Sequence, residues 1–146
     1  MNVRRVAVGD YHIGCVDRGT GSAVLLIPGL GGEASFWADV GDRLAGDFRV
    51  IAIDHRGCGD SSSLGRECSI ATMADDALGV LNALAIPAAM IVGHSTGGAI
   101  AQWIAAHHGA RCTKLVLSST WAGPNPYMAA SFDLRLRILD ALGIGA

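Results

Sequence analysis

The sequence has little charge of either sign. Only 16% of its 146 residues are charged and the formal net charge is −2, against about 25% charged residues in an average soluble domain. Because nucleic acid and anionic membranes attract basic surfaces, we expect neither as a partner. Long apolar runs are also missing: the richest, residues 23–27, stops at Pro28, well short of the ~18 residues that a membrane-spanning helix needs.

The sequence also lacks closely spaced cysteines and histidines of the kind that bind a metal ion. No two cysteines stand in a CxxC arrangement, and the adjacent His107 and His108 cannot share one ion on a helix, so we expect no metal. The N-terminus has no apolar stretch of the length a signal peptide requires, since residues 6–8 give way at once to Gly9. We expect a cytoplasmic protein with reduced thiols. The four cysteines are Cys15, Cys58, Cys68 and Cys112.

Hydrophobic residues are abundant: they make up 51% of the sequence and stand in short runs. Two β-prone segments around Gly9 predict a hairpin. Continuous apolar runs then alternate with segments of helical period, which predicts an α/β domain whose six-stranded sheet is largely parallel, its strands buried on both faces. The expected strands are 3–8, 11–16, 23–27, 49–53, 88–92 and 114–118; the expected helices are 36–44, 69–84, 99–108 and 128–142.

The most informative pattern is GHSTG at residues 93–97. An apolar run ends directly before it and an apolar helix is expected directly after it, which is the strand–turn–helix setting of a nucleophile elbow. Such a turn holds Ser95 in a strained conformation with its hydroxyl above the sheet edge. Gly93 and Gly97 leave space where a side chain would collide. A serine that merely caps a helix in a glycine-rich turn remains the alternative.

Glycines between a strand and a helix can also cradle a phosphate. Residues 29–32 and 93–98 contain neither GxGxxG nor GxxxxGK[ST], however. We therefore reject a dinucleotide or phosphate loop and expect no cofactor.

Three motifs together resemble the α/β-hydrolase superfamily. They are LLIPGLGG at 25–32, DHRGCGDS at 54–61 and VGHSTGGAIA at 92–101, in the order and spacing of that superfamily. The resemblance covers nearly the whole chain and is nearest to small acyl hydrolases such as 3-oxoadipate enol-lactonases and aminoacrylate hydrolases. It implies the N-terminal half of the α/β-hydrolase fold, with a partial core over residues 1–123 and the start of a helical cap over 124–146.

The resemblance also implies roles for individual residues. The elbow nucleophile falls on Ser95, and the backbone N–H groups of Thr96 and Leu30 become the donors of the oxyanion hole. The DxRGxGxS loop is structural in the superfamily, so residues 54–56 are expected to be scaffold. Pro28 replaces the histidine that is common before the oxyanion residue, and we expect this to be tolerated because the backbone N–H does the work.

The chain departs from the superfamily in one larger respect. The catalytic order there is Ser, then Asp or Glu, then His, and members are roughly twice this length, so we expect the acid and the base beyond Ala146. His94 is expected to point away from the attack site. Of the histidines present, His55 is the least implausible base, and a structural role explains it better. As it stands, the chain is expected to be inactive or feeble.

The activity that the sequence predicts is hydrolysis of a small ester, thioester or lactone through an acyl-enzyme on Ser95, with a small acyl molecule as the substrate. A C–C bond hydrolase or an acyltransferase of the same fold is possible on this evidence, as is a non-catalytic ligand-binding protein. The sequence identifies neither the substrate nor the oligomeric state.

Overall fold

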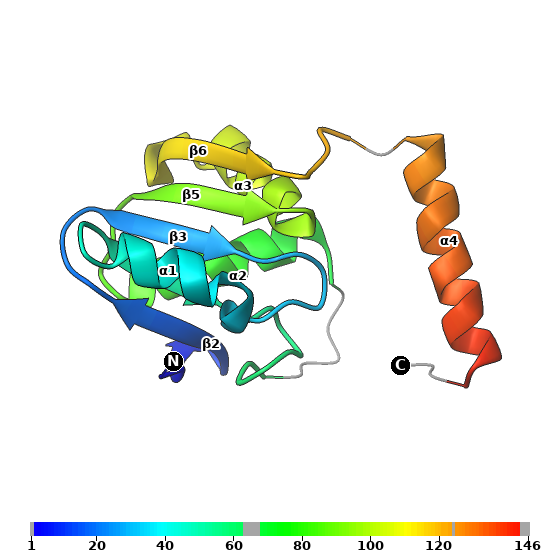
Figure 1. Cartoon of the computed structure of the whole chain (residues 1–146), viewed down its shortest axis with the longest axis horizontal. Coiled ribbons are helices and arrows are strands. Elements are labelled where there is room, and N and C mark those ends of the chain that lie inside the picture. The colour runs from blue at the N-terminus through cyan, green and yellow to red at the C-terminus, as the bar shows by residue number, and fades with distance from the viewer. Residues whose placement is uncertain (1, 63–67, 124, 144–146) are drawn as a thin grey trace.

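The computed structural model describes residues 2–62, 68–123 and 125–143. Its elements alternate along the chain as the apolar runs predict (Figure 1). The strands are β1 (Arg4–Val8), β2 (Tyr11–Arg18), β3 (Ala23–Ile27), β4 (Arg49–Ile53), β5 (Ala89–His94) and β6 (Cys112–Ser118). The helices are η1 (Ala34–Trp37), α1 (Ala38–Leu44), α2 (Ile70–Ala83), α3 (Thr96–His107), η2 (Gly109–Arg111) and α4 (Pro126–Ala141).

The strands form one six-stranded sheet in the order β1-β2-β4-β3-β5-β6. β4, β3, β5 and β6 are parallel, whereas the β1–β2 hairpin joins the sheet antiparallel to β4. The sequence therefore predicts the fold class, the strand count and the hairpin correctly. Because β4, β3 and β5 are adjacent and parallel, the loops that follow them lie together at the carboxyl ends of these strands.

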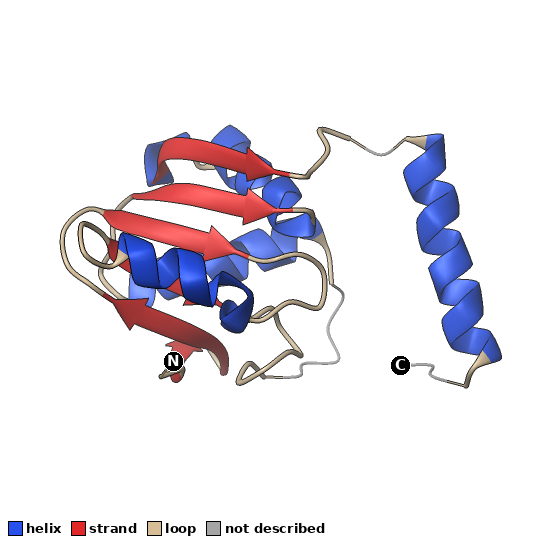
Figure 2. Cartoon of the chain, in the orientation of Figure 1, coloured by secondary structure: helices blue, strands red, loops and turns tan. Residues whose placement is uncertain are grey.

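Helices cover both faces of the sheet (Figure 2). The side chains of successive strand residues point to opposite faces. Leu25 and Ile27 pack in the cluster that includes residues of α2 and α3, while Val24 and Leu26 pack in the cluster that includes Trp37. The central strands are thus buried on both faces, as their continuous apolar sequence requires.

Helix α2 begins at a capping box formed by Ser69 and Thr72. The Ser69 hydroxyl accepts from the Thr72 N–H at 3.1 Å, and the Thr72 hydroxyl accepts from the Ser69 N–H at 2.9 Å. This reciprocal capping box satisfies two N–H groups that the first helical turn would otherwise leave unpaired.

The prediction that residues 114–118 form a buried strand is wrong in one respect. They lie in β6, but β6 is an edge strand, and its Leu115, Val116 and Leu117 side chains are 39–46% exposed. An apolar run predicts burial only where neighbours exist on both sides, and within the described residues β6 pairs with β5 alone.

Helix α4 stands apart from the sheet, beyond the ends of β5 and β6 (Figure 1). None of its residues is buried, and Leu136, which its helical period places on an apolar face, is 61% exposed. That residues 124–146 begin a cap remains a prediction. In the part of the chain that the structure describes, no helix is long and apolar enough to cross a membrane.

Candidate active site

Ser95 occupies a strained turn between β5 and α3. Its backbone has φ 54° and ψ −119°, a left-handed conformation that costs a non-glycine residue about 1–3 kcal/mol. Backbone hydrogen bonds hold it there. Its N–H donates to the Ser118 carbonyl at 2.9 Å, and its carbonyl accepts from the Thr120 hydroxyl at 2.7 Å and from the N–H groups of Gly98 at 2.9 Å and Ala99 at 3.4 Å. This geometry is that of a nucleophile elbow, and it removes the reading of Ser95 as a plain helix cap, because its side chain makes no cap bond.

The glycines on either side of Ser95 are required by close backbone contacts. A Cβ atom on Gly93 would lie 2.2 Å from the Gly97 carbonyl oxygen, and one on Gly97 would lie 2.2 Å from the Ile27 carbonyl oxygen. Neither position has room for a side chain unless the backbone moves. β3, β5 and α3 therefore approach one another more closely than any other residue at these positions would allow.

The loop that carries Leu30 runs alongside the elbow. A Cβ atom on Gly29 would lie 3.3 Å from the Ser95 Cβ atom, so the two segments are in contact. The loop closes through a bond from the Gly32 N–H to the Gly29 carbonyl at 2.9 Å. The segment expected to supply the second oxyanion donor thus lies beside the expected nucleophile.

The DHRGCGDS loop holds the loop after β3 in place through hydrogen bonds. The ring Nε2 of buried His55 donates to the Pro28 carbonyl at 2.9 Å, and the His55 N–H donates to the Gly32 carbonyl at 3.1 Å. The buried Asp54 carboxylate accepts from the N–H groups of Ala34 at 2.7 Å and Asp60 at 2.9 Å. These contacts give both residues a structural role, as the sequence predicts.

Arg56 also has a structural partner. Its guanidinium binds the buried Asp76 carboxylate through two hydrogen bonds of 2.7 and 2.8 Å, and Tyr11 donates to the same carboxylate at 2.5 Å. The pair ties the loop after β4 to helix α2. Its carboxylate is therefore occupied and does not orient a catalytic base.

A cavity of about 270 Å³ opens at Ser95. It brings together the expected nucleophile, the loop after β3 and one residue of α4. Its lining consists of Pro28, Gly29, Leu30, Gly32, Phe36, His94, Ser95 and Arg135. Thr96 is buried beneath it at the start of α3. Sequence reasoning missed Phe36, His94 and Arg135 as residues of this site.

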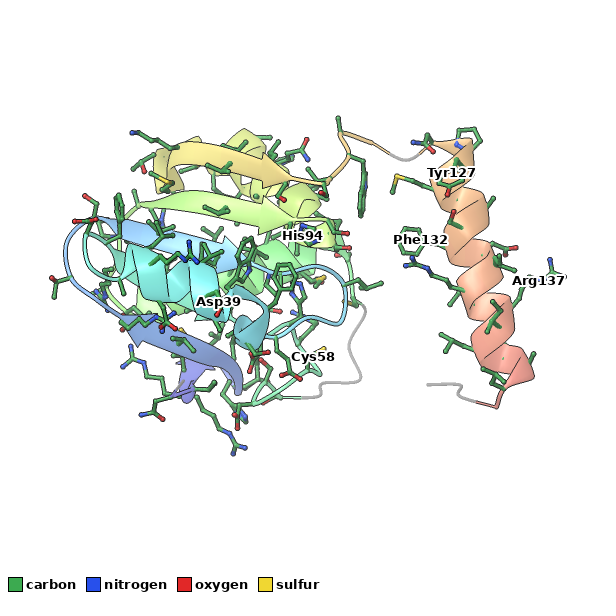
Figure 3. The ribbon with its side chains drawn as sticks, viewed as in Figure 1. Asp39, Cys58, His94, Tyr127, Phe132 and Arg137 are labelled. Carbon is green, nitrogen blue, oxygen red and sulfur yellow. The ribbon has the colours of Figure 1, made fainter. Side chains whose placement is uncertain are left out.

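His94 lines the same cavity as Ser95, and among the described residues its ring makes no hydrogen bond to Ser95. Its ring stacks on Phe36 with centroids 5.0 Å apart, and its Nδ1 lies 3.3 Å from the Ser118 hydroxyl. β5 extends two residues beyond its predicted end, and its alternation places His94 on the same face as Val92, toward the Phe36 side. Figure 3 labels His94 at the end of this strand. An alternation count continued through residue 94 would have indicated this position.

No hydrogen bond joins a histidine ring to Ser95 within residues 2–62, 68–123 and 125–143. His55 is engaged with Pro28, the His12 ring bonds the Ser62 hydroxyl at 2.9 Å, and the His107 ring stacks on Trp103. The described residues also contain no group of three side chains suited to hold a metal ion.

Cys58 does not offer an alternative nucleophile. Burial and the nearby Glu33 and Asp54 carboxylates raise the pKa of the Cys58 thiol above its usual value. A reactive cysteine requires the opposite shift, because the thiolate is the attacking species. Cys58 occupies a variable position of the DxRGxGxS turn after β4, and it needs no catalytic role there.

Mild acid is expected to weaken the fold through His55. Burial lowers the pKa of its imidazole, so below about pH 6.5 the unfolded chain binds a proton that the folded chain does not. Stability is therefore complete above that pH and falls as the pH drops toward the lowered pKa, by at most ~1.4 kcal/mol per pH unit. Urea unfolding at about pH 7.5 and about pH 5.5 measures the loss.

The matched variant for this prediction is His55→Gln. A glutamine amide can donate to the Pro28 carbonyl but does not titrate, so the variant should lose less stability than the unaltered chain over the same pH interval. An equal loss in both chains would contradict the assignment to His55.

Comparison with known proteins places these features in a family. Residues 22–143 match the α/β hydrolase fold family. The chain belongs to that family.

The individual relatives are named as hydrolases. "Putative carbamate hydrolase RutD" of Variovorax paradoxus is 45% identical over 125 residues, which are 84% of this chain and 47% of that protein. Among solved structures, a hydrolase from Pseudomonas aeruginosa superposes with a TM-score of 0.84 at 30% identity, covering 94% of this chain and 52% of that one. The enol-lactonase from Burkholderia xenovorans superposes with a TM-score of 0.80 at 28% identity, covering 95% and 56%. The chain spans about half the length of the curated relatives it matches.

Proposed function

We propose that this chain carries the nucleophile and the oxyanion hole of a serine hydrolase. The observation that carries the proposal is the conformation of Ser95, held at φ 54° between two glycines that cannot accept a side chain. Strain of this kind persists only where the surrounding structure enforces it, and it is commonly part of a mechanism.

In the proposed reaction the Ser95 hydroxyl attacks the carbonyl carbon of a small acyl substrate. The carbonyl oxygen becomes an oxyanion, which accepts hydrogen bonds from the backbone N–H groups of Thr96 and Leu30. Loss of one such donor typically costs about 2.7–4 kcal/mol of transition-state stabilisation. The leaving group departs, and water then hydrolyses the acyl-Ser95 ester to release the acid.

A base must accept the Ser95 proton and return it to the leaving group. Since no histidine bonds Ser95 in the described residues, we assign this base, and the acid that orients it, to residues outside them. The catalytic triad is therefore divided: the described half supplies attack and charge stabilisation, and the other half supplies proton transfer.

The cavity and the relatives support a small substrate. A volume of about 270 Å³ is at the small end of ligand sites, which are commonly about 300–1,000 Å³. Relatives are named as a carbamate hydrolase and an enol-lactonase. We propose a small ester, thioester, lactone or carbamate as substrate, with no metal or cofactor taking part.

The proposal is tested by the turnover of p-nitrophenyl acetate on the 146-residue chain. With the proposed oxyanion donors in place and no base in contact with Ser95 among the described residues, we expect at most about 10³–10⁴-fold acceleration over water. A rate near that of ordinary serine esterases would contradict the divided triad. No acceleration at all, together with ligand binding, would favour a non-catalytic binding protein.

A further inference from the structure

One face of α4 is turned toward the sheet. Met128, Ser131, Phe132 and Arg135 recur at the spacing that puts residues on one side of a helix. The first three are half-buried, whereas every other described residue of α4 is exposed. The Phe132 ring lies edge-on to Trp121, with centroids 6.4 Å apart. Figure 3 shows Phe132 pointing back toward the sheet and Arg137 pointing away from it.

Arg135 lies on this face and reaches the active-site cavity. It lines the same cavity as Ser95 and Leu30, and its guanidinium carbon lies 5.4 Å from the centroid of the Phe132 ring. A guanidinium that rests on an aromatic face is partly held in place before it meets a ligand. Arg135 is the one residue of α4 in the lining of this cavity, and it is the one arginine or lysine there.

Among the residues that the structure describes, no carboxylate pairs with the Arg135 guanidinium. No carboxylate lines the cavity, and none of the ion pairs among the described residues includes Arg135, although other arginines of the chain pair with aspartates. A cation without a counter-charge beside a nucleophile attracts an anionic ligand. A planar guanidinium fits a carboxylate best, because two parallel N–H groups meet two oxygens.

We propose that Arg135 binds an anionic group of the substrate, so that the preferred substrate is a short acyl compound that carries a carboxylate. In this arrangement the carboxylate pairs with Arg135 while the acyl carbonyl lies at Ser95. The inference rests on the proposed function, since it places the carboxylate by reference to the attack site. It makes α4 a specificity element of the Ser95 site.

The test compares two ligands that differ in charge and little in shape. Monomethyl succinate ends in a carboxylate, and methyl succinamate ends in a neutral amide. Their dissociation constants for the 146-residue chain are measured by NMR titration at low ionic strength. We expect the anion to bind about threefold to tenfold more tightly, in the range of a charge-assisted hydrogen bond at a partly exposed site. Added salt should reduce the difference.

Two arginine variants test whether the preference for the anionic ligand depends on Arg135. Arg135→Met retains an apolar stem against Phe132 and removes the charge, so it should remove the preference for the anion. Arg137→Met removes the same charge from the opposite side of α4 and should leave the preference intact. Circular dichroism checks that both variants keep the helix content of the unaltered chain.

The same NMR samples separate failure of this inference from failure of the proposed function. Methanol released from either ester reports hydrolysis, and the titration reports binding. Equal affinity for the two ligands, or equal loss in the two variants, would overturn the role of Arg135 whether or not methanol appears. An anion preference lost only in Arg135→Met supports it even where no methanol is released.

Discussion

Replacing Ser95 by cysteine is expected to make the 146-residue chain react faster with p-nitrophenyl acetate. Among the described residues no base contacts the Ser95 hydroxyl, so almost none of it is ionised at neutral pH. A thiol of ordinary pKa is about a tenth thiolate at pH 7.5 and needs no base to attack. With the oxyanion donors unchanged, acylation should accelerate at least about tenfold. The burst of p-nitrophenolate under single-turnover conditions measures it.

The chain supplies its own control for this result. Burial raises the pKa of Cys15 to about 12 and also raises the pKa of Cys58 and Cys112 above the usual value. These native thiols should therefore react slowly, and the unaltered chain shows their combined rate. Ser95→Ala should react no faster than the unaltered chain. If Ser95→Cys gave no increase, position 95 would not face a carbonyl held by the oxyanion donors.

Gly93→Ala is expected to destabilise the fold by about 3 kcal/mol or more. The added Cβ atom would lie 2.2 Å from the Gly97 carbonyl oxygen and 2.5 Å from its carbonyl carbon. Because both atoms belong to the backbone, no side chain can rotate away, and β5 or the first turn of α3 must move. Insertion into a packed core typically costs 1–3 kcal/mol, and a fixed backbone contact puts this variant at or above that range. Urea unfolding monitored by tryptophan fluorescence measures the change.

Gly46→Ala is the matched control. A Cβ atom on Gly46 meets nothing within 4 Å, so the substitution adds the same methyl group without a collision. We expect its free energy of unfolding to stay within about 0.5 kcal/mol of that of the unaltered chain. A similar loss in the two variants would show that the elbow tolerates a side chain, and the close approach of β5 to α3 would then be wrong.

The fold could be predicted because the residues of each segment determine whether that segment forms a strand or a helix. Runs such as 23–27 and 49–53 are apolar at every position, which is typical of strands buried on both faces, and the four parallel strands follow from the helices between them. The elbow was equally accessible, since the turn at Ser95 is encoded by its own neighbours. Asp54 and His55 could be separated from the chemistry because the loop motif that contains them shapes a turn.

The features that could not be predicted depend on contacts between distant segments. Residues 115–117 of β6 are as apolar as the residues of β3, yet the place of β6 at the sheet edge leaves Val116 46% exposed. Arg135 stands 40 positions after Ser95, and only the path of the chain through Trp121 brings α4 to the cavity. A hydrophobic pattern predicts neither arrangement, because it describes one helix or strand at a time.

The central claim, that Ser95 is a nucleophile beside an oxyanion hole, is tested most directly by locating the acyl group. The unaltered chain is incubated with p-nitrophenyl acetate, digested, and analysed by peptide mass spectrometry. We predict that Ser95 gains the acetyl group before any other serine, with Ser22, at the opposite end of the sheet, as the internal reference. Acetylation of Lys114 and the N-terminal amine alone, with Ser95 unmodified, would contradict the claim.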